Sequence, residues 1–139
     1  NLQSWTLKDD ETGEPLHVQQ RRQIEAYWEA WKEAGHPREP RVSVSRSIFA
    51  LVNDMDRAYF GGGGREEDQF GYIEPEKRAA FGRGYAAEPD VLIKELAADQ
   101  AIAEADTLLL TVPNQLGVEY NAHIIKSILQ LVAPELGWR

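Results

Sequence analysis

The stretch Ala105-Asp106-Thr107-Leu108-Leu109-Leu110-Thr111-Val112-Pro113 decides how this chain folds. It is a near-continuous apolar run between an acidic residue and a proline, which is typical of a strand buried on both faces of a parallel sheet. Parallel strands need long crossover connections, and these are usually helices. We therefore expect helices before and after this strand.

Two helices are predicted beside this strand in the sequence. The later one spans about residues 120–131, and the earlier one begins near Pro89. Both are predicted from apolar residues that recur on one helix face. These are Ile124, Ile125, Ile128 and Leu131 in the later helix, and Val91, Leu92, Leu96 and Ile102 in the earlier one.

A second strand is predicted over residues 41–51. Val42 and Val44 alternate with serines, so one face of the strand is apolar and the other is polar but small. The serines would face water in a β-sandwich, but in a parallel barrel they could face the interior near its polar mouth. A helix with an apolar stripe from Ile24 to Trp31 precedes this strand. A short extended segment, about residues 1–7, opens the chain, and a short helix is expected over residues 53–59.

Four consecutive glycines, Gly61 to Gly64, open a polar stretch that we predict to be a long loop over about residues 60–83. Loops of this length within a domain are usually functional or disordered. The sequence lacks the lysine and helix of a phosphate loop. Two interpretations stay open, a lid over a site or a surface excursion without a gating role.

The composition excludes several classes of protein. Hydrophobic residues make up 42% and charged residues 27% of the 139 positions, as in an ordinary folded domain. The formal net charge of −8 argues against nucleic acid as a partner, because phosphate binding needs a basic surface. No apolar run approaches the roughly 20 residues of a membrane-spanning helix. We expect a cytoplasmic protein with no membrane partner.

The sequence offers no sign of a metal site. It contains no cysteine, and its three histidines, His17, His36 and His123, have no ligand spacing between them. Alternating strands and helices indicate an α/β chain with a parallel sheet. A closed eight-stranded barrel needs roughly 250 residues, so this chain would hold about half of one. The chain also opens at Asn1 rather than methionine, and we interpret it as a fragment, one partial domain over residues 1–139.

Three segments in order carry a resemblance to a known family. Residues 105–113 with the helix that follows resemble the last strand and helix of luciferase-like, flavin-dependent monooxygenases, the superfamily of bacterial luciferase and alkanesulfonate monooxygenase. Residues 85–90 resemble the turn after the seventh strand, and residues 41–46 resemble the sixth strand with its closing arginine. The resemblance implies the carboxyl-terminal half, about strands five to eight, of a (β/α)₈ TIM-type barrel.

The resemblance also implies a chemistry. The parent would use reduced FMN, supplied by a separate flavin reductase, and dioxygen to oxidise a small organic substrate. The resemblance does not separate FMN from a deazaflavin. Because residues that approach the flavin ring lie on early strands of the barrel, the fragment alone is expected to be inactive.

Four residues are candidates for the site of such an enzyme. Ser4 and Thr6 follow the fifth strand, where the family places hydroxyls against the FMN phosphate, although Trp5 stands where the family has a small residue. Arg46 matches an active-site arginine that could hold an anionic substrate or steady a negative charge on the flavin. Arg65, in the lid, is the residue expected to reach the substrate.

Each candidate has a plainer alternative. Ser4 and Thr6 could be ordinary residues at a strand end. The alternation with Val42 and Val44 would send Arg46 outward toward the helices, where it would pair with a carboxylate. For the chain as a whole, the alternative is a non-catalytic half-barrel that self-associates or pairs with another chain. In either case we expect the exposed core to be covered in a homo-oligomer or by the missing amino-terminal half.

Overall fold

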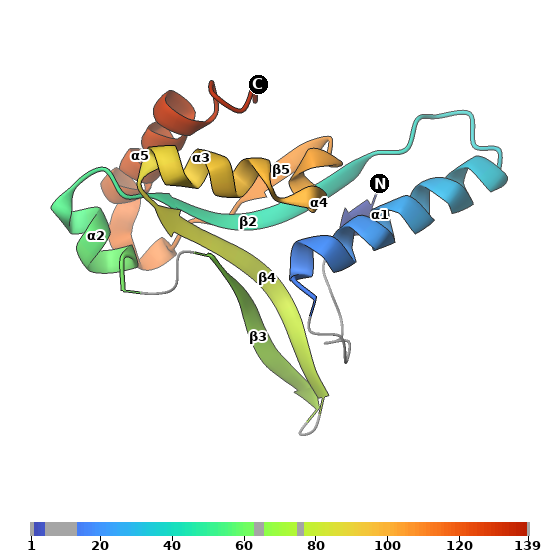
Figure 1. Ribbon diagram of the computed structural model, residues 1–139, viewed down its shortest axis with the longest axis horizontal. Helices are drawn as coiled ribbons and strands as arrows, with labels where there is room; N and C mark the ends of the chain where they lie inside the picture. Colours follow the sequence, from blue (N-terminus) through green and yellow to red (C-terminus); the bar gives the residue numbers. More distant parts are fainter. Residues whose placement is uncertain (1, 5–13, 63–65, 75–76, 139) are drawn as a thin grey trace.

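The computed structural model describes residues 2–4, 14–62, 66–74 and 77–138, and their arrangement is α/β, as the sequence predicts (Figure 1). The elements are β1 (Leu2–Ser4), α1 (Leu16–Glu33), β2 (Val42–Ala50), α2 (Asp54–Phe60), β3 (Glu66–Glu74), β4 (Lys77–Ala87), α3 (Pro89–Ala97), α4 (Gln100–Ala103), β5 (Thr107–Leu110) and α5 (Gly117–Ser127). A 3-10 turn, η1 (Asn114–Leu116), precedes α5, and a π-helical turn, η2 (Ile128–Val132), continues it.

Strand β2 is the centre of the sheet. It pairs in parallel with β1 along its first half, with β4 along its second half, and with β5. The carbonyls of Val42 and Arg46 accept hydrogen bonds from the segment around β5, whereas the N–H of Leu51 donates to the end of β4. Because backbone groups of alternate residues point to opposite edges of a strand, β5 and β4 lie on opposite sides of β2.

The strand order differs from that of a barrel whose neighbouring strands follow one another along the chain. In such a barrel β5 would pair with β4, but here β5 pairs with β2. The described strands therefore form an open, mostly parallel sheet.

The prediction of a long loop over residues 60–83 is wrong for most of that range, because most of it forms two strands. β3 and β4 form an antiparallel hairpin that projects away from the helices (Figure 1). Glycines and acidic residues suggested a loop, but the stretch from Phe70 to Ile73 is rich in aromatic and β-branched residues, which favour strands. Pairing with β4 outweighs the loop-like composition of the first residues of β3.

The helices cover one face of the sheet. Every second side chain of β2, from Val42 to Ala50, is buried on that face. Two clusters form the core there. The first joins Ile48 and Tyr85 to Leu92 and Leu96 of α3 and to Ile124 and Ile128, and the second joins Val42 and Val44 to Ile24 of α1 and Ala101 of α4.

The opposite face of the sheet has a different character, and we call it the open face. Its side chains are only partly buried or are exposed, because no described helix packs across most of it. Small and hydroxyl-bearing residues dominate. The open face consists of Ser43, Ser45, Ser47 and Phe49 of β2, Gly84 and Ala86 of β4, Thr107 and Leu109 of β5, and Thr111 just after β5. At its carboxyl end Phe49 stacks on Phe60 of α2, with ring centroids 3.9 Å apart.

The prediction that β5 is buried on both faces is wrong. Leu108 and Leu110 pack on the core, but Leu109 between them is 40% exposed. The apolar run suggested burial on both sides, and the missing cover over the open face explains the difference.

Candidate functional site

Arg46 lies on the helix side of the sheet, in a buried polar network. Its Nε and Nη2 donate to the two carboxylate oxygens of Asp99 at 2.7 and 3.0 Å, and Nη2 also donates to Oε1 of Gln20 at 2.8 Å. Nη1 donates to the carbonyl of Ser45 at 2.8 Å. The side chains of Arg46 and Asp99 are both 0% exposed. The network therefore holds a complete ion pair away from water.

Local structure explains why Asp99 is available to Arg46. Asp99 caps α4, and its Oδ1 accepts the N–H groups of Ala101 and Ile102 at 3.0 Å each. Its Oδ2 accepts the hydroxyl of Tyr85 at 2.7 Å. Burial alone would raise the pKa of Asp99, but the hydrogen bonds and charge of Arg46 outweigh it and hold that pKa below its ordinary value.

The network continues from Tyr85 toward the hairpin. The Tyr85 hydroxyl accepts a hydrogen bond from Nε of Arg83 at 2.8 Å, and Nη1 of Arg83 donates to Asp68 at 2.6 Å. Burial and the neighbouring Asp99 raise the pKa of Tyr85, so its hydroxyl stays protonated. This chain of polar contacts joins β4 to β2, β3 and α4.

The geometry of Arg46 favours the alternative that it pairs with a carboxylate on the helix side. The pleat of β2 directs it there, as the alternation with Val42 and Val44 predicts. Its guanidinium is buried and engaged by Asp99, Gln20 and Ser45, so in this conformation it is not presented to a ligand. We assign Arg46 a structural role.

The other three predicted site residues are not tested by the side-chain geometry. Thr6 and Arg65 lie outside the described residues. Ser4 ends β1, where its backbone pairs with Val44 of β2. These three residues stay predictions.

A second polar cluster lies at the carboxyl end of β2, and its central residue is Asp56. This residue is 2% exposed although it belongs to α2 near the surface. Its Oδ2 accepts the backbone N–H groups of Val52 and Asn53 at 3.1 and 3.2 Å. In return, Oδ1 of Asn53 accepts the N–H of Asp56 at 2.8 Å, which completes a capping box. The carboxylate is thus fixed by the start of α2.

Two side chains from α5 complete this cluster, which we call the Asp56 cluster: Asp56, Tyr120 and His123. The hydroxyl of Tyr120 donates to Oδ1 of Asp56 at 2.5 Å, and Nε2 of His123 lies 3.0 and 3.1 Å from its two oxygens. Burial alone would raise the pKa of Asp56, but the hydrogen bonds from Tyr120, His123 and Val52 lower it below its ordinary value. Burial and Asp56 together raise the pKa of Tyr120.

The Asp56 cluster is a candidate site for proton transfer. The His123 side chain is 33% exposed, whereas Asp56 beneath it is buried. A titratable ring with one end on a fixed carboxylate and the rest reachable from solvent is an arrangement that can exchange protons with a ligand. In open α/β sheets, ligands bind at the carboxyl ends of the strands, which is where this cluster lies.

Sequence reasoning missed this cluster. It treated His123 as isolated, because Asp56 is 67 positions earlier in the chain. The spacing of Asn53 and Asp56 is the one signal that the sequence offered, since it marks a capping box and thus the direction of α2. Nothing in the local sequence indicated that α5 would lie against α2.

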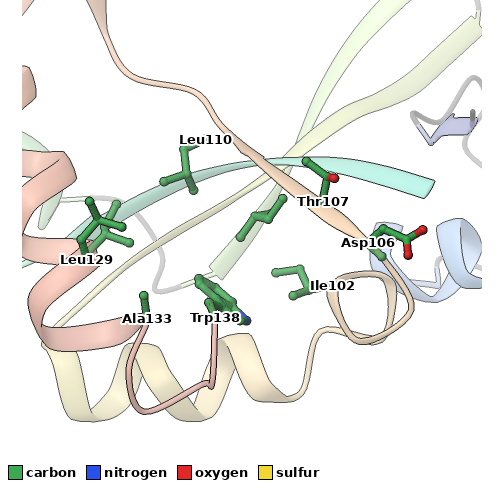
Figure 2. Close-up of a pocket in the computed structure, with 10 residues that line it drawn as sticks. Ile102, Asp106, Thr107, Leu110, Leu129, Ala133 and Trp138 are labelled. Carbon is green, nitrogen blue, oxygen red and sulfur yellow. The ribbon is translucent and has the colours of Figure 1, made fainter. Parts of the chain in front are cut away.

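Two further features lie near β5. On the open face, the hydroxyls of Ser47 and Thr111 are 2.6 Å apart and exposed. On the helix side, a mostly apolar hollow of ≈ 460 Å³ lies between β5, α4 and the carboxyl-terminal segment (Figure 2). Its one charged lining residue, Asp106, accepts the N–H of Val42 at 2.8 Å. The hollow therefore offers space for packing but no evident group for chemistry.

The described residues contain no group of three or more acidic or histidine side chains placed to hold a metal ion. Among them there is also no helix long and apolar enough to cross a membrane. Comparison of the chain with family models, with curated proteins and with solved structures found no match. The interpretation of function therefore rests on the residues and their geometry.

Proposed function

We propose that this chain is the carboxyl-terminal half of a luciferase-like, flavin-dependent monooxygenase barrel that oxidises a small organic molecule. The observation that carries the proposal is the open face. Helices cover one side of the sheet, and the other side presents hydroxyls and small residues, as the interior of a barrel does near its polar mouth. The order of segments along the chain, which resembles strands five to eight of that family, supports the same proposal.

The open face fits a flavin in its chemistry. The exposed hydroxyls of Ser47 and Thr111 can donate to the polar edge of the ring or to a phosphate. When bound, FMN reduced by a separate reductase supplies the reaction with dioxygen. The residues of this chain would bind and orient it and exclude water. Ser4 and Thr6 as phosphate contacts, and Arg65 in a lid, belong to the same proposal.

The proposal makes a demand on the strand order. In the complete barrel β5 would lie beside β4, on the edge that β3 holds here. When the missing strands are added, β5 would therefore leave β2, and β3 would leave that edge of β4. Cysteines at Ser45 and Leu109, which are paired neighbours here, test this in a chain that has no other cysteine. The disulfide is expected to form in the isolated chain and to be absent from the completed barrel. A disulfide that forms equally in both would contradict the barrel.

Flavin binding is the direct test. The quenching of FMN fluorescence is expected to saturate as the chain is added, and the double variant Ser47→Ala, Thr111→Val is expected to weaken binding about tenfold, because two hydroxyl hydrogen bonds are lost. Ser127→Ala, a change at a buried serine of α5, is the matched control and should leave binding unchanged. The isolated chain should not raise the consumption of dioxygen above that of reduced FMN alone, which reacts with dioxygen by itself. An absence of saturable FMN binding would contradict the proposal.

A second function, association with another chain, is supported by the edge of β5 that no described strand pairs with and by the apolar hollow beside this strand. Among the described strands, β5 pairs only with β2, and its open face and the adjoining hollow expose Leu109 and other apolar groups. A non-catalytic half-barrel would cover these surfaces by associating with a second copy or another chain. Light scattering at micromolar concentration distinguishes the two functions. A stable oligomer that binds no FMN favours the second, and a monomer that binds FMN favours the first.

A further inference from the structure

The contacts of His123 indicate which of its ring nitrogens carries hydrogen. Asn53 uses its Oδ1 to accept the N–H of Asp56, so its Nδ2 is the group that faces Nε2 of His123, at 3.2 Å. Both oxygens of Asp56 also face Nε2, at 3.0 and 3.1 Å. The Asp56 carboxylate would be satisfied by a hydrogen on Nε2, whereas the Nδ2 group of Asn53 would be satisfied by a lone pair there. A full negative charge outweighs an amide dipole, so Nε2 carries hydrogen.

The other ring nitrogen of His123 is then the reactive one. In the neutral ring, hydrogen on Nε2 leaves a lone pair on Nδ1. Within the described part of the chain, no hydrogen bond reaches Nδ1, and the side chain is 33% exposed. This is the arrangement of an oriented base: a carboxylate fixes one nitrogen, and the opposite nitrogen is left for a ligand.

We propose that His123 is a general base that takes a proton at Nδ1 from the hydroxyl group of a small aromatic ligand. The proton leaves the ligand oxygen as its O–H bond breaks, and a new N–H bond forms at Nδ1. The resulting imidazolium keeps its Nε2–H on the Asp56 carboxylate and pairs with the ligand oxyanion. This site is independent of the proposed flavin chemistry and needs no cofactor.

Exposed side chains beside the cluster give the ligand its class. Tyr59 of α2 is 55% exposed and meets Tyr120 edge to face at 5.4 Å, and Tyr120 in turn lies 5.5 Å from the His123 ring. Met55, one turn earlier on α2, is 56% exposed. Aromatic rings and a thioether form a surface that suits an aromatic ring carrying one hydroxyl.

Neither neighbour of His123 competes for the role of base. Tyr120 donates its hydroxyl to Asp56, which together with burial raises the pKa of Tyr120 and keeps it protonated. Asp56 is buried and already accepts hydrogen bonds from four groups, the N–H groups of Val52 and Asn53 and the side chains of Tyr120 and His123. Neither group is therefore free to take the proton of the ligand, which leaves Nδ1 of His123 as the base.

The probe for the experiment is 4-nitrophenol, whose phenolate is yellow and whose phenol is not. Below the pH at which free 4-nitrophenol ionises, adding the protein is expected to produce a saturable phenolate band, because the bound hydroxyl loses its proton to Nδ1. His123→Asn should abolish the band, and Asp56→Asn should lower it about tenfold. His36→Asn, which changes an exposed histidine far from the cluster, is the matched control and should leave it intact.

The absence of a phenolate band with the unmodified protein, or an equal band with His123→Asn, would overturn the proposal. A second measurement covers the case in which Asp56→Asn does not fold. Nitrogen NMR of the imidazole in the unmodified protein should show hydrogen on Nε2 of neutral His123, and hydrogen on Nδ1 instead would also overturn the proposal. Neither measurement involves a flavin, so failure here is separable from failure of the monooxygenase function.

Discussion

Two aspartates in this chain have almost the same surroundings and opposite consequences. Asp99 and Asp56 are both buried, both lie at the start of a helix, and both accept a tyrosine hydroxyl. Asp99 pairs with Arg46, which is always charged and here 0% exposed. Asp56 pairs with His123, whose side chain is 33% exposed.

The partner decides what each carboxylate does. An arginine that cannot lose its proton, held on all sides, joins β2 to α4 and α1 and fixes their positions. A histidine with one nitrogen held and the other reachable can pass a proton while the carboxylate stays in place. We therefore interpret the Arg46–Asp99 pair as a structural element of the fold and the Asp56 cluster as a candidate site for proton transfer.

The largest expected effect on stability comes from removing Arg46 from its buried ion pair with Asp99. Arg46→Met would leave the Asp99 carboxylate buried with one neutral donor from Tyr85 and two backbone donors, and we expect a loss of about 3–5 kcal/mol in the free energy of unfolding. Urea unfolding followed by circular dichroism measures it. Arg21→Met breaks the exposed pair of Arg21 with Glu25, and this control should cost less than about 0.5 kcal/mol.

The pleat of β2 also shows how much of the fold the sequence could predict. Alternation of valine and serine gave the strand within one residue at each end and gave the side on which Arg46 lies. This works because the side-chain period of a strand is fixed by local geometry. The family resemblance favoured an active-site arginine, and the local rule proved the better guide to its position.

The sequence could not predict features that depend on distant partners. The strands β3 and β4 stabilise each other by pairing, while the acidic start of β3 alone reads as a loop. His123 and Asp56 are in contact because α5 and α2 follow two parallel strands, β5 and β2, whose carboxyl ends lie at the same end of the sheet. Such meetings depend on topology, which periodicity within one element does not contain.

The next largest effect on stability is expected for Tyr85, and the exposed Tyr59 serves as its control. Tyr85→Phe removes a donor from Asp99 and an acceptor from Arg83, both inside the closed network, and we expect a loss of about 1–3 kcal/mol. Thermal and urea unfolding provide the measurement. Tyr59→Phe, at an exposed position, should change stability by less than about 0.5 kcal/mol. Equal effects of the two changes would show that the network around Tyr85 contributes little.

Tyr120→Phe should have a smaller effect and a pH dependence. Asp56 keeps its other donors, so the expected loss at neutral pH is about 1 kcal/mol. The pKa of Asp56 is lowered in the folded state, so its contribution is complete above the unfolded pKa, about 3.9, and is lost as pH falls through the folded pKa. The difference between Tyr120→Phe and the unmodified protein should therefore shrink below about pH 4. A difference that stays constant down to pH 2 would contradict the role of ionised Asp56.

The smallest expected effect separates His17 from His123 and so sharpens the contrast between held and reachable rings. His17 accepts the N–H of Gln100 at Nδ1, 3.2 Å away, and burial lowers its pKa, with Arg83 and Arg46 lowering it further against the opposing charge of Asp99. Between its folded pKa and about 6.5 the unfolded chain binds more protons than the folded one, so stability should fall as pH drops through that window. Because the ring is only half-buried, the change should be on the order of a few tenths of a kcal/mol. His17→Asn keeps an acceptor for Gln100 without a titrating ring, and it should flatten the dependence of urea stability on pH in this window. An unchanged slope in His17→Asn would assign the dependence to another group.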